Sequence, residues 1–577
     1  KIELDIEECH RRIDAVVSYQ EEFIKTDFDE CHRRMDAIVS HQDECTKPDI
    51  DDCNRRIDKC IRMILDLDYI VCSNRYRSEE MIQTNSMILE GINIRQDMFA
   101  ELINYLIEHF DLDSKEFLGI SIIFVIVGIV YSKKFKGLNN YLLANRSVGT
   151  FSLTSSLVAS ALGAWILFGP ASAATWGGIG AVIGYALGTA FPLFILIYLG
   201  TQFREKYPKG KTLIEVIRFK YGPNLFKLIL VLSIFYMTIF LIAEVTAVSM
   251  LINYISGTDL WITAFIVIIS SLIYTLYGGL RASIFTDNIQ FLFLIVLLLI
   301  TFSYLLNFNT NEFNFDYIKT KQPQLLSINY LPNFTAGLTF FIAVAATNLF
   351  HQGNWQRVYA AKNTEVLKKS LIFSFLIIIP IVFFMGFTGL VAVSSENLVA
   401  PDLAFFQLLL KDQYLIISVI IIFLAISLTV SSIDTIINAI SSLIISDGKK
   451  IIKIKNYDLL SKQIIIILSI VALFVASKGL SILYLFLLAD LLCCAAVLSI
   501  FYGFYSKSFS EKKAYVSILI GLLAGLLLFP SPDFSKSILI GILFPTNLFP
   551  NFFSQSLLFL SFITATFAPV IIWRIKD

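Results

Sequence analysis

The stretch Leu428-Thr429-Val430-Ser431-Ser432-Ile433-Asp434-Thr435 places hydroxyl groups and a carboxylate inside an otherwise apolar run at 415–445. A helix of about 20 apolar residues crosses the hydrocarbon core of a bilayer, and this run is long enough. A carboxylate at that depth is costly, so it normally faces a cavity, a partner or an ion. The stretch therefore predicts an ion site on a membrane-spanning helix.

The composition of the whole chain is that of a polytopic membrane protein. Of its 577 residues, 56% are hydrophobic and only 16% are charged, whereas soluble domains are about one quarter charged. Mean hydropathy is +0.71. The membrane part shows no nucleotide-binding loop, no metal-ligand cluster and no nucleophile paired with a base, so we expect neither an enzyme nor a nucleic-acid partner.

Residues 1–115 form a separate, charged segment with an internal repeat. The pattern around Cys9 recurs around Cys31 and Cys53, and its apolar positions step by three and four residues. This predicts a helical bundle or coiled coil. Its cysteines fill core positions, form disulfides or bind metal with nearby histidines, and these alternatives stay open. We expect a domain of unassigned role that mediates oligomerisation or a protein contact.

Residues 116–577 predict about 13 transmembrane helices. Lys and Arg cluster in alternate connections, so the positive-inside rule places the amino-terminal domain outside and the carboxyl terminus in the cytoplasm. We therefore expect a multi-pass protein of the cell (inner) membrane. The expected spans are 117–132, 147–169, 174–200, 213–253, 258–278, 283–307, 334–350, 369–396, 414–446, 462–477, 479–504, 514–531 and 552–573.

The second of these spans is rich in small and hydroxyl-bearing residues. We expect Gly169-Pro170 to break or end it. Broken helices at the midplane free backbone carbonyls that hold cations in many transporters. Close packing of small residues against neighbouring helices is the alternative.

Three further stretches resemble motifs of the sodium:solute symporter family, which includes proline, sugar, sialic-acid and urea symporters. They are Asn140–Ser147, Gly278–Gln290 and Gln356–Asn363, and the opening stretch resembles the family's eighth core helix. The resemblance covers about residues 116–505 in the family's order, without residues 1–115. It implies an all-α polytopic fold with a core of two inverted five-helix repeats and alternating access.

The resemblance also implies sodium bound between the first and eighth core helices. Carried over by position, the ligands are the backbone carbonyls of Ala159, Leu162 and Leu428 and the hydroxyls of Ser431 and Ser432. Independently of the family, such oxygens replace the water around a hard cation. Hydrogen bonding between helices is the alternative role of the two serines.

In part of the family a second sodium site uses an acid of the fifth core helix, which Asp287 matches. Asp434 and Thr435 occupy the partner positions, although Asp434 stands where the family has a hydroxyl. Two carboxylates close together bind a second cation, or one of them carries a proton. Alternatively, Asp287 caps its helix near the cytoplasm.

Two more acids, Glu244 and Asp490, lie deep in predicted spans. Buried acids without a basic partner favour an amine-bearing or cationic solute, or proton coupling. Pairing with a hydroxyl or a water-filled vestibule is the alternative. By resemblance, Trp165 forms a wall over the solute and Thr347 takes a solute position on the sixth core helix, where it argues against sugar.

The sequence therefore predicts sodium-coupled symport of a small organic solute, such as an amino acid, a polyamine or a urea-like compound. The alternative is a transporter-like sensor whose amino-terminal domain reports solute occupancy. Sodium is the one cofactor expected, and the small solute and the lipid bilayer are the expected partners.

Overall fold

The computed structural model describes residues 138–208, 210–307, 318–320, 322–393, 400–410, 415–451, 456–506, 509–532 and 557–573, with 534, 536–537 and 539–540. The repeat domain expected at 1–115 and the first expected span at 117–132 lie outside these residues. The described part contains helices and connections with two isolated β-bridges and no strand, which confirms an all-α protein.

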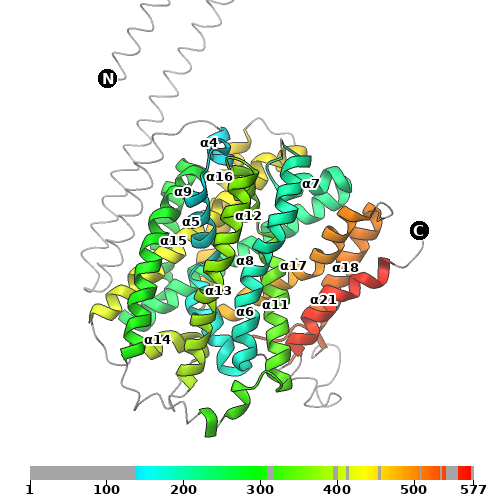
Figure 1. The fold of residues 1–577 in the computed structure, drawn as a ribbon. Helices are drawn as coiled ribbons and strands as arrows, with labels where there is room; N and C mark the ends of the chain where they lie inside the picture. The colour runs from blue at the N-terminus through cyan, green and yellow to red at the C-terminus, as the bar shows by residue number, and fades with distance from the viewer. Residues whose placement is uncertain are drawn as a thin grey trace, which may run out of the picture. The chain divides into compact units, whose positions relative to one another are not determined.

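Figure 1 shows the helices of the described residues. They are α4 (Leu138–Leu143), α5 (Thr150–Ala161), α6 (Trp165–Lys206), α7 (Leu213–Lys220), α8 (Pro223–Ser256), α9 (Leu260–Asn307), α11 (Leu331–Phe350), α12 (Gln352–Ala360), α13 (Thr364–Val393), α14 (Ala404–Leu409), α15 (Leu415–Ser446), α16 (Tyr457–Ala476), α17 (Ile482–Tyr505), α18 (Glu511–Leu528) and α21 (Leu557–Trp573).

Eight helical stretches in the described residues are long and apolar enough to cross a membrane, and two shorter ones are also apolar. The expected segment 213–253 divides into α7 and α8, separated by Gly222 at φ 139° and by Pro223. Proline fits the first turn of α8 because its missing N–H has no helical partner there.

Two glycines bend long helices: Gly279 lies in the gap expected between two spans, whereas Gly178 lies inside the expected span 174–200. Gly178 (φ 55°, ψ −153°) kinks α6, and Gly279 (φ 58°, ψ −159°) kinks α9. Both conformations are readily available only to a residue without a Cβ. Each kink therefore joins two consecutive spans through a single residue.

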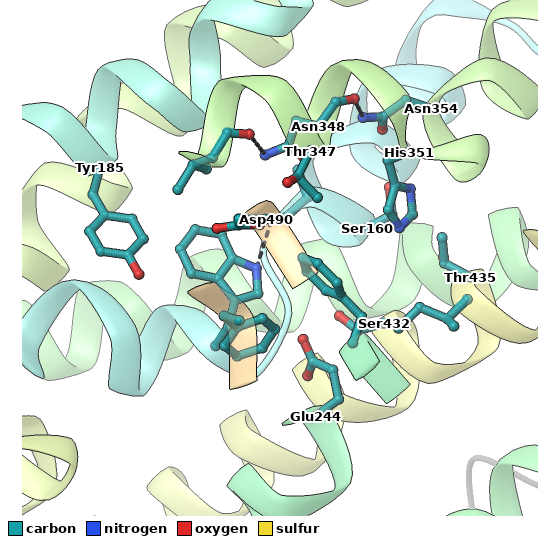
Figure 2. A pocket seen from close by; sticks show the side chains of 16 residues that line it. Ser160, Tyr185, Glu244, Thr347, Asn348, His351, Asn354, Ser432, Thr435 and Asp490 are labelled. Atoms are coloured by element: carbon teal, nitrogen blue, oxygen red, sulfur yellow. Dashed lines mark hydrogen bonds between the residues drawn. The ribbon is translucent and has the colours of Figure 1, made fainter. Parts of the chain in front are cut away.

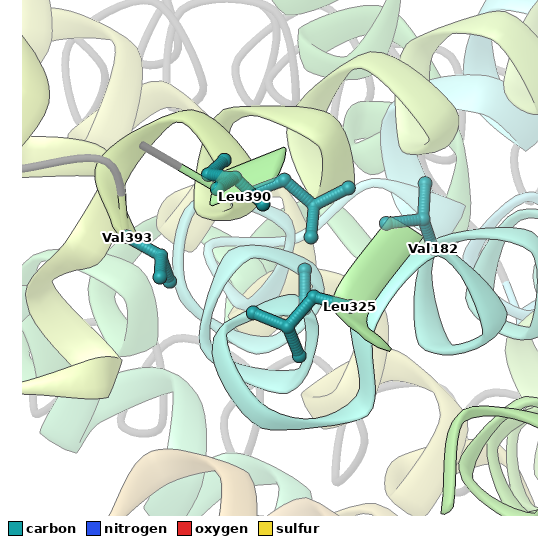
Figure 3. Packing of buried hydrophobic residues seen from close by; sticks show 6 residues of the cluster. Val182, Leu325, Leu390 and Val393 are labelled. Carbon is teal, nitrogen blue, oxygen red and sulfur yellow. The ribbon is translucent and has the colours of Figure 1, made fainter. Parts of the chain in front are cut away.

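The apolar cluster in Figure 3 packs around the kink of α6. Val182 of α6 meets Leu325 from the turn before α11, together with Leu390 and Val393 near the end of α13. The same interface places Asn333 of α11 so close to Gly178 that a side chain there would collide with it. Close packing thus fixes the direction of α6 beyond the bend.

The expected break at Gly169-Pro170 was wrong in position. Both residues lie inside α6, and the chain leaves helical geometry earlier, at Leu162 (φ −104°, ψ 74°) between α5 and α6. Gly163 follows, at a point where a Cβ would collide with Glu244 and Ser432. Side chains from two other helices therefore occupy the space of the missing Cβ, which fixes the break there.

A second break separates α11 from α12 at His351 (φ −59°, ψ 113°). The helix carrying the opening stretch, α15, packs against α8 and α9, and 94% of its most apolar stretch is buried, against 28% in α16. Its hydroxyls and carboxylate therefore lie inside the protein rather than against lipid, as the solvation argument requires.

Candidate functional site

A cavity lies where the two helix breaks face α8, α15 and α17. The space within it that a water-sized sphere can occupy is about 50 Å³, which is enough for a few water molecules. Figure 2 shows the side chains that line it. The polar and charged ones are Ser160, Glu244, Thr347, Asn348, His351, Asn354, Ser432, Thr435 and Asp490.

The cavity is acidic. Glu244 of α8 and Asp490 of α17 line it with exposures of 1% and 4%. Neither lysine nor arginine occurs among its described lining residues. A buried carboxylate is costly without a compensating charge. The lining therefore favours a positively charged occupant.

Aromatic rings form the rest of the wall. Trp165, Tyr185, Phe240 and Phe486 all line the cavity. Trp165 is held by its indole N–H, which donates to the Ala161 carbonyl at 3.2 Å, and its ring stacks on Tyr185 with centroids 5.9 Å apart. Ring faces attract ammonium groups, so these walls suit the same occupant as the acids.

Glu244 stabilises the break before α6. Its Oε2 accepts the Ala164 backbone N–H at 2.9 Å. The first N–H groups of a helix lack helical acceptors and carry partial positive charge, which favours a carboxylate there. Ala164 immediately precedes α6, so Glu244 caps the second half of the broken helix.

Asp490 of α17 lies beside α11, the first half of the second broken helix. Its carboxylate lies within hydrogen-bonding reach of the Thr347 hydroxyl, and Figure 2 shows the two side chains close together. Asn348 and Asn354 continue this polar wall, because the Asn354 amide donates to the Asn348 carbonyl at 2.8 Å. His351, at the break between α11 and α12, lines the cavity as well.

Three of the residues expected to bind sodium, Ala159, Leu162 and Ser432, lie at or beside the first break. No described backbone N–H donates to the Ala159 or Leu162 carbonyl, because the helical ladder stops there. Ser432 approaches the same point from α15, where a Cβ on Gly163 would collide with its hydroxyl. Leu428 lies one turn earlier on α15, inside a continuous helix.

Ser431 points from α15 toward another group. Its hydroxyl donates to Asp287 Oδ1 at 2.7 Å, and Ser156 of α5 donates to Oδ2 at 2.6 Å. Asp287 is thus an acceptor shared by three helices. It lies two turns beyond the kink of α9, with no exposed surface, so its role is not that of a helix cap.

The partner of Asp287 is Arg357 of α12, which the sequence reasoning missed as a site residue. Arg357 Nη2 lies 2.7 Å from Asp287 Oδ2 and 3.1 Å from Thr435 Oγ1, and its Nε donates to Ser156 at 2.7 Å. Both charged side chains are fully buried. The sequence did contain a signal for this pairing. A carboxylate predicted at membrane depth requires a partner, and Arg357 is a basic residue in one of the stretches that resemble the family.

Two of the three residues expected to form a second cation site are therefore arranged around a guanidinium. Asp287 and Thr435 both contact Arg357. Asp434 turns toward α9, where Ser283 donates to Oδ1 at 2.8 Å and Thr286 to Oδ2 at 3.2 Å. The described residues contain no group of three His, Cys, Asp or Glu side chains suited to a metal ion.

Contacts away from the cavity tie its helices together at two places. At one end of α15, Lys450 Nζ lies 2.8 Å from Asp447 Oδ1 and 3.0 Å from Glu215 Oε1 of α7. Elsewhere, Asp402 accepts the Ser172 hydroxyl of α6 at 2.8 Å and the Ile482 N–H of α17 at 3.3 Å. Relative movement of these helices requires such contacts to break.

Known transporters resemble the chain in sequence. It is 26% identical over 407 residues to the spermidine transporter DUR31 of Candida albicans, which covers 68% of this chain and 76% of that protein. It is also 26% identical over 189 residues to the probable urea active transporter 1 of Schizosaccharomyces pombe, across 32% of this chain and 28% of the relative.

A solved structure shares the fold. A sodium-coupled sialic acid symporter in a substrate-bound, outward-open state superposes with a TM-score of 0.59 at 18% identity, covering 80% of this chain and 98% of the other. The sequence pattern of the sodium:solute symporter family matches residues 141–521. These residues contain both broken helices, the cavity walls and the Asp287–Arg357 pair, and the chain therefore belongs to the sodium:solute symporter family.

Proposed function

We propose that this solute symporter couples sodium entry to the uptake of an amine-bearing solute, with polyamines as the favoured class. The observation that carries the proposal is the pair of buried acids, Glu244 and Asp490, in a cavity whose described lining contains neither lysine nor arginine. An ammonium group supplies the missing charge, and a polyamine carries more than one.

The aromatic walls support this class of solute. Trp165, Tyr185, Phe240 and Phe486 offer ring faces to ammonium groups and apolar surface to the methylene chain between them. A neutral solute such as urea leaves both carboxylates without a counter-charge. The similarity to a spermidine transporter points in the same direction.

Sodium coupling follows from the break between α5 and α6. The carbonyls of Ala159 and Leu162 and the hydroxyl of Ser432 are hard oxygen donors at one place, as sodium prefers. Leu428 and Ser431 complete the proposed set. Occupation of this site ties α15 to the broken helix, which in an alternating-access cycle links ion binding to closure around the solute.

Transport by the purified protein in vesicles tests this function. We expect an inward sodium gradient to raise uptake of labelled spermidine or putrescine at least tenfold over a potassium gradient, with urea and glucose not accumulated. Asp490→Asn is expected to raise the KM for spermidine at least tenfold. Asp458→Asn is the matched control, because Asp458 is half exposed and pairs with Lys462 outside the cavity.

Two results would contradict the proposal. Equal spermidine uptake with and without a sodium gradient would refute sodium coupling. Accumulation of neutral solutes alone, with an unaltered KM in Asp490→Asn, would refute the amine-bearing class.

We also propose that residues 1–115 are an accessory domain outside the cell membrane, with the carboxyl terminus in the cytoplasm. This rests on the repeat and on the alternation of Lys and Arg in the connections. Deletion of residues 1–115 is expected to leave the sodium-driven uptake rate per molecule unchanged. Loss of uptake by a correctly inserted, truncated protein would show that the domain belongs to the transport machinery.

A further inference from the structure

Glu244 contacts both the start of α6 and the break before it. Oε2 accepts the Ala164 N–H at 2.9 Å, and the Trp165 backbone N–H also interacts with the carboxylate. Oε1 lies beside Gly163, where a Cβ would collide with it. The backbone ahead of α6 thus holds the carboxylate at the break.

Ser432 reaches the same point from α15. A Cβ on Gly163 would collide with its hydroxyl as well, so the hydroxyl and Glu244 Oε1 converge beside the break. Among the described residues, no hydrogen bond engages the Ser432 hydroxyl, although the residue is only 5% exposed. Ser432 lines the cavity, so a hydroxyl without a described partner, beside a carboxylate oxygen, indicates space for a ligand that both atoms contact.

The backbone adds two oxygens at this place. Leu162 directly precedes Gly163, and Ala159 lies one turn earlier, and the carbonyls of both lack a described N–H donor. Oxygen atoms from the end of α5, from α8 and from α15 are therefore found at or beside this break, and one of them belongs to a carboxylate. Hard cations such as sodium bind sets of this kind.

We propose that Glu244 is a ligand of the coupling cation, so that sodium is held by a carboxylate as well as by neutral carbonyl and hydroxyl oxygens. This rests on the proposed sodium coupling and adds to it a residue on α8. The two acids of the cavity then have separate tasks: Glu244 neutralises the ion, and Asp490, beside Thr347, binds the solute's ammonium group.

The arrangement has a mechanical consequence. Glu244 contacts the first N–H before α6 while it contacts the ion, so sodium binding and the position of α6 are linked through one side chain. Trp165, the first residue of α6, lines the cavity. Sodium therefore organises the wall of the solute site before the solute arrives.

Direct binding of radioactive sodium to the purified full-length protein, measured without solute by scintillation proximity, tests the proposal. Glu244→Gln removes the charge but keeps an oxygen that accepts the Ala164 N–H, so the cap survives. We expect this variant and Ser432→Ala to raise the half-saturating sodium concentration at least tenfold. Asp490→Asn is the matched control and should bind sodium as the wild type does.

Spermidine binding at saturating sodium distinguishes a role of Glu244 in sodium binding from a role in solute binding. In Glu244→Gln, unchanged sodium binding with at least tenfold weaker spermidine binding would overturn the proposal and assign Glu244 to the solute, leaving sodium-coupled transport intact. Absence of sodium binding by the wild type would instead overturn sodium coupling itself. Should Glu244→Gln elute as an aggregate, Glu244→Asp, which retains the charge on a shorter stem, is expected to bind sodium more weakly, and wild-type affinity there would overturn the proposal.

Discussion

Arg357 Nη2 lies 2.7 Å from Asp287 Oδ2, and both side chains are completely buried. The pair connects α12 to α9, and Ser156 and Ser431 complete the hydrogen bonding of the carboxylate. Burial removes both charges from water, so each depends on the other for compensation. This dependence makes the pair a sensitive point of the fold.

Asp287→Asn is expected to destabilise the protein by about 3–5 kcal/mol, because an uncompensated buried guanidinium remains. Thermal unfolding in detergent measures the effect. The double variant Asp287→Asn with Arg357→Met should recover part of the loss. Glu365→Gln removes the partner of Lys369 in an exposed pair and should leave the melting temperature unchanged. A single variant as stable as the wild type would show that the buried charges are compensated elsewhere.

Gly163→Ala is expected to lower uptake at least tenfold, because the added methyl group enters the space of the Ser432 hydroxyl and the Glu244 carboxylate. Initial rates in vesicles provide the measurement. Gly149→Ala is the control: Gly149 precedes α5 at φ −83°, and a Cβ there would have no neighbour within 4 Å. Uptake that responds equally to both substitutions would contradict a special role of the break.

Ser431→Ala tests whether this hydroxyl serves sodium or only Asp287, to which it donates at 2.7 Å. As a sodium ligand it should rotate toward the ion, so the variant should need about tenfold more sodium for half-maximal uptake, equivalent to about 1.4 kcal/mol. Ser427→Ala, one turn away on the same buried helix, should leave the sodium requirement unchanged. An identical sodium curve for Ser431→Ala would remove this residue from the site.

Lys450→Met is expected to loosen α7 from α15, because Lys450 bonds to both Glu215 and Asp447. The buried Asp447 would then keep only the hydrogen bond from Thr212, at 2.6 Å. Hydrogen exchange of the amides in 211–220 should accelerate at least severalfold, since local opening costs less. Lys462→Met, in the exposed pair with Asp458, should not change it, and equal protection in both variants would contradict the expectation.

Much of the fold could be predicted from the sequence because hydrocarbon imposes simple rules. The lengths of the apolar runs predicted most of the spans. The solvation cost of a carboxylate predicted that α15 faces protein rather than lipid. The position of the helix break was missed because Gly169-Pro170 is a local signal. The actual break depends on Glu244, a residue far away in sequence whose carboxylate takes the place of a helical acceptor.

The site residues divide in the same way. Ser432 and Leu162 were predicted from resemblance, and the structure places the Ser432 hydroxyl beside Gly163, the residue that follows Leu162. The arrangement around Asp287 could not be predicted from spacing, since Arg357 follows it by 70 positions on a different helix. Which buried charges lie next to each other depends on three-dimensional packing. A single sequence shows which residues are charged but not which of them are in contact.

Gly178 and Gly279 give the molecule a further property. Each joins two successive spans through one residue at nearly the same backbone angles, with no flexible connection between them. A flexible loop lets one span move without moving the next, whereas a single bent residue transmits a displacement of one span directly to the other. α6, whose first residue lines the cavity, and α9, which carries Asp287, are thus each rigidly connected to a neighbouring span. We therefore expect these spans to move in pairs during transport rather than one at a time.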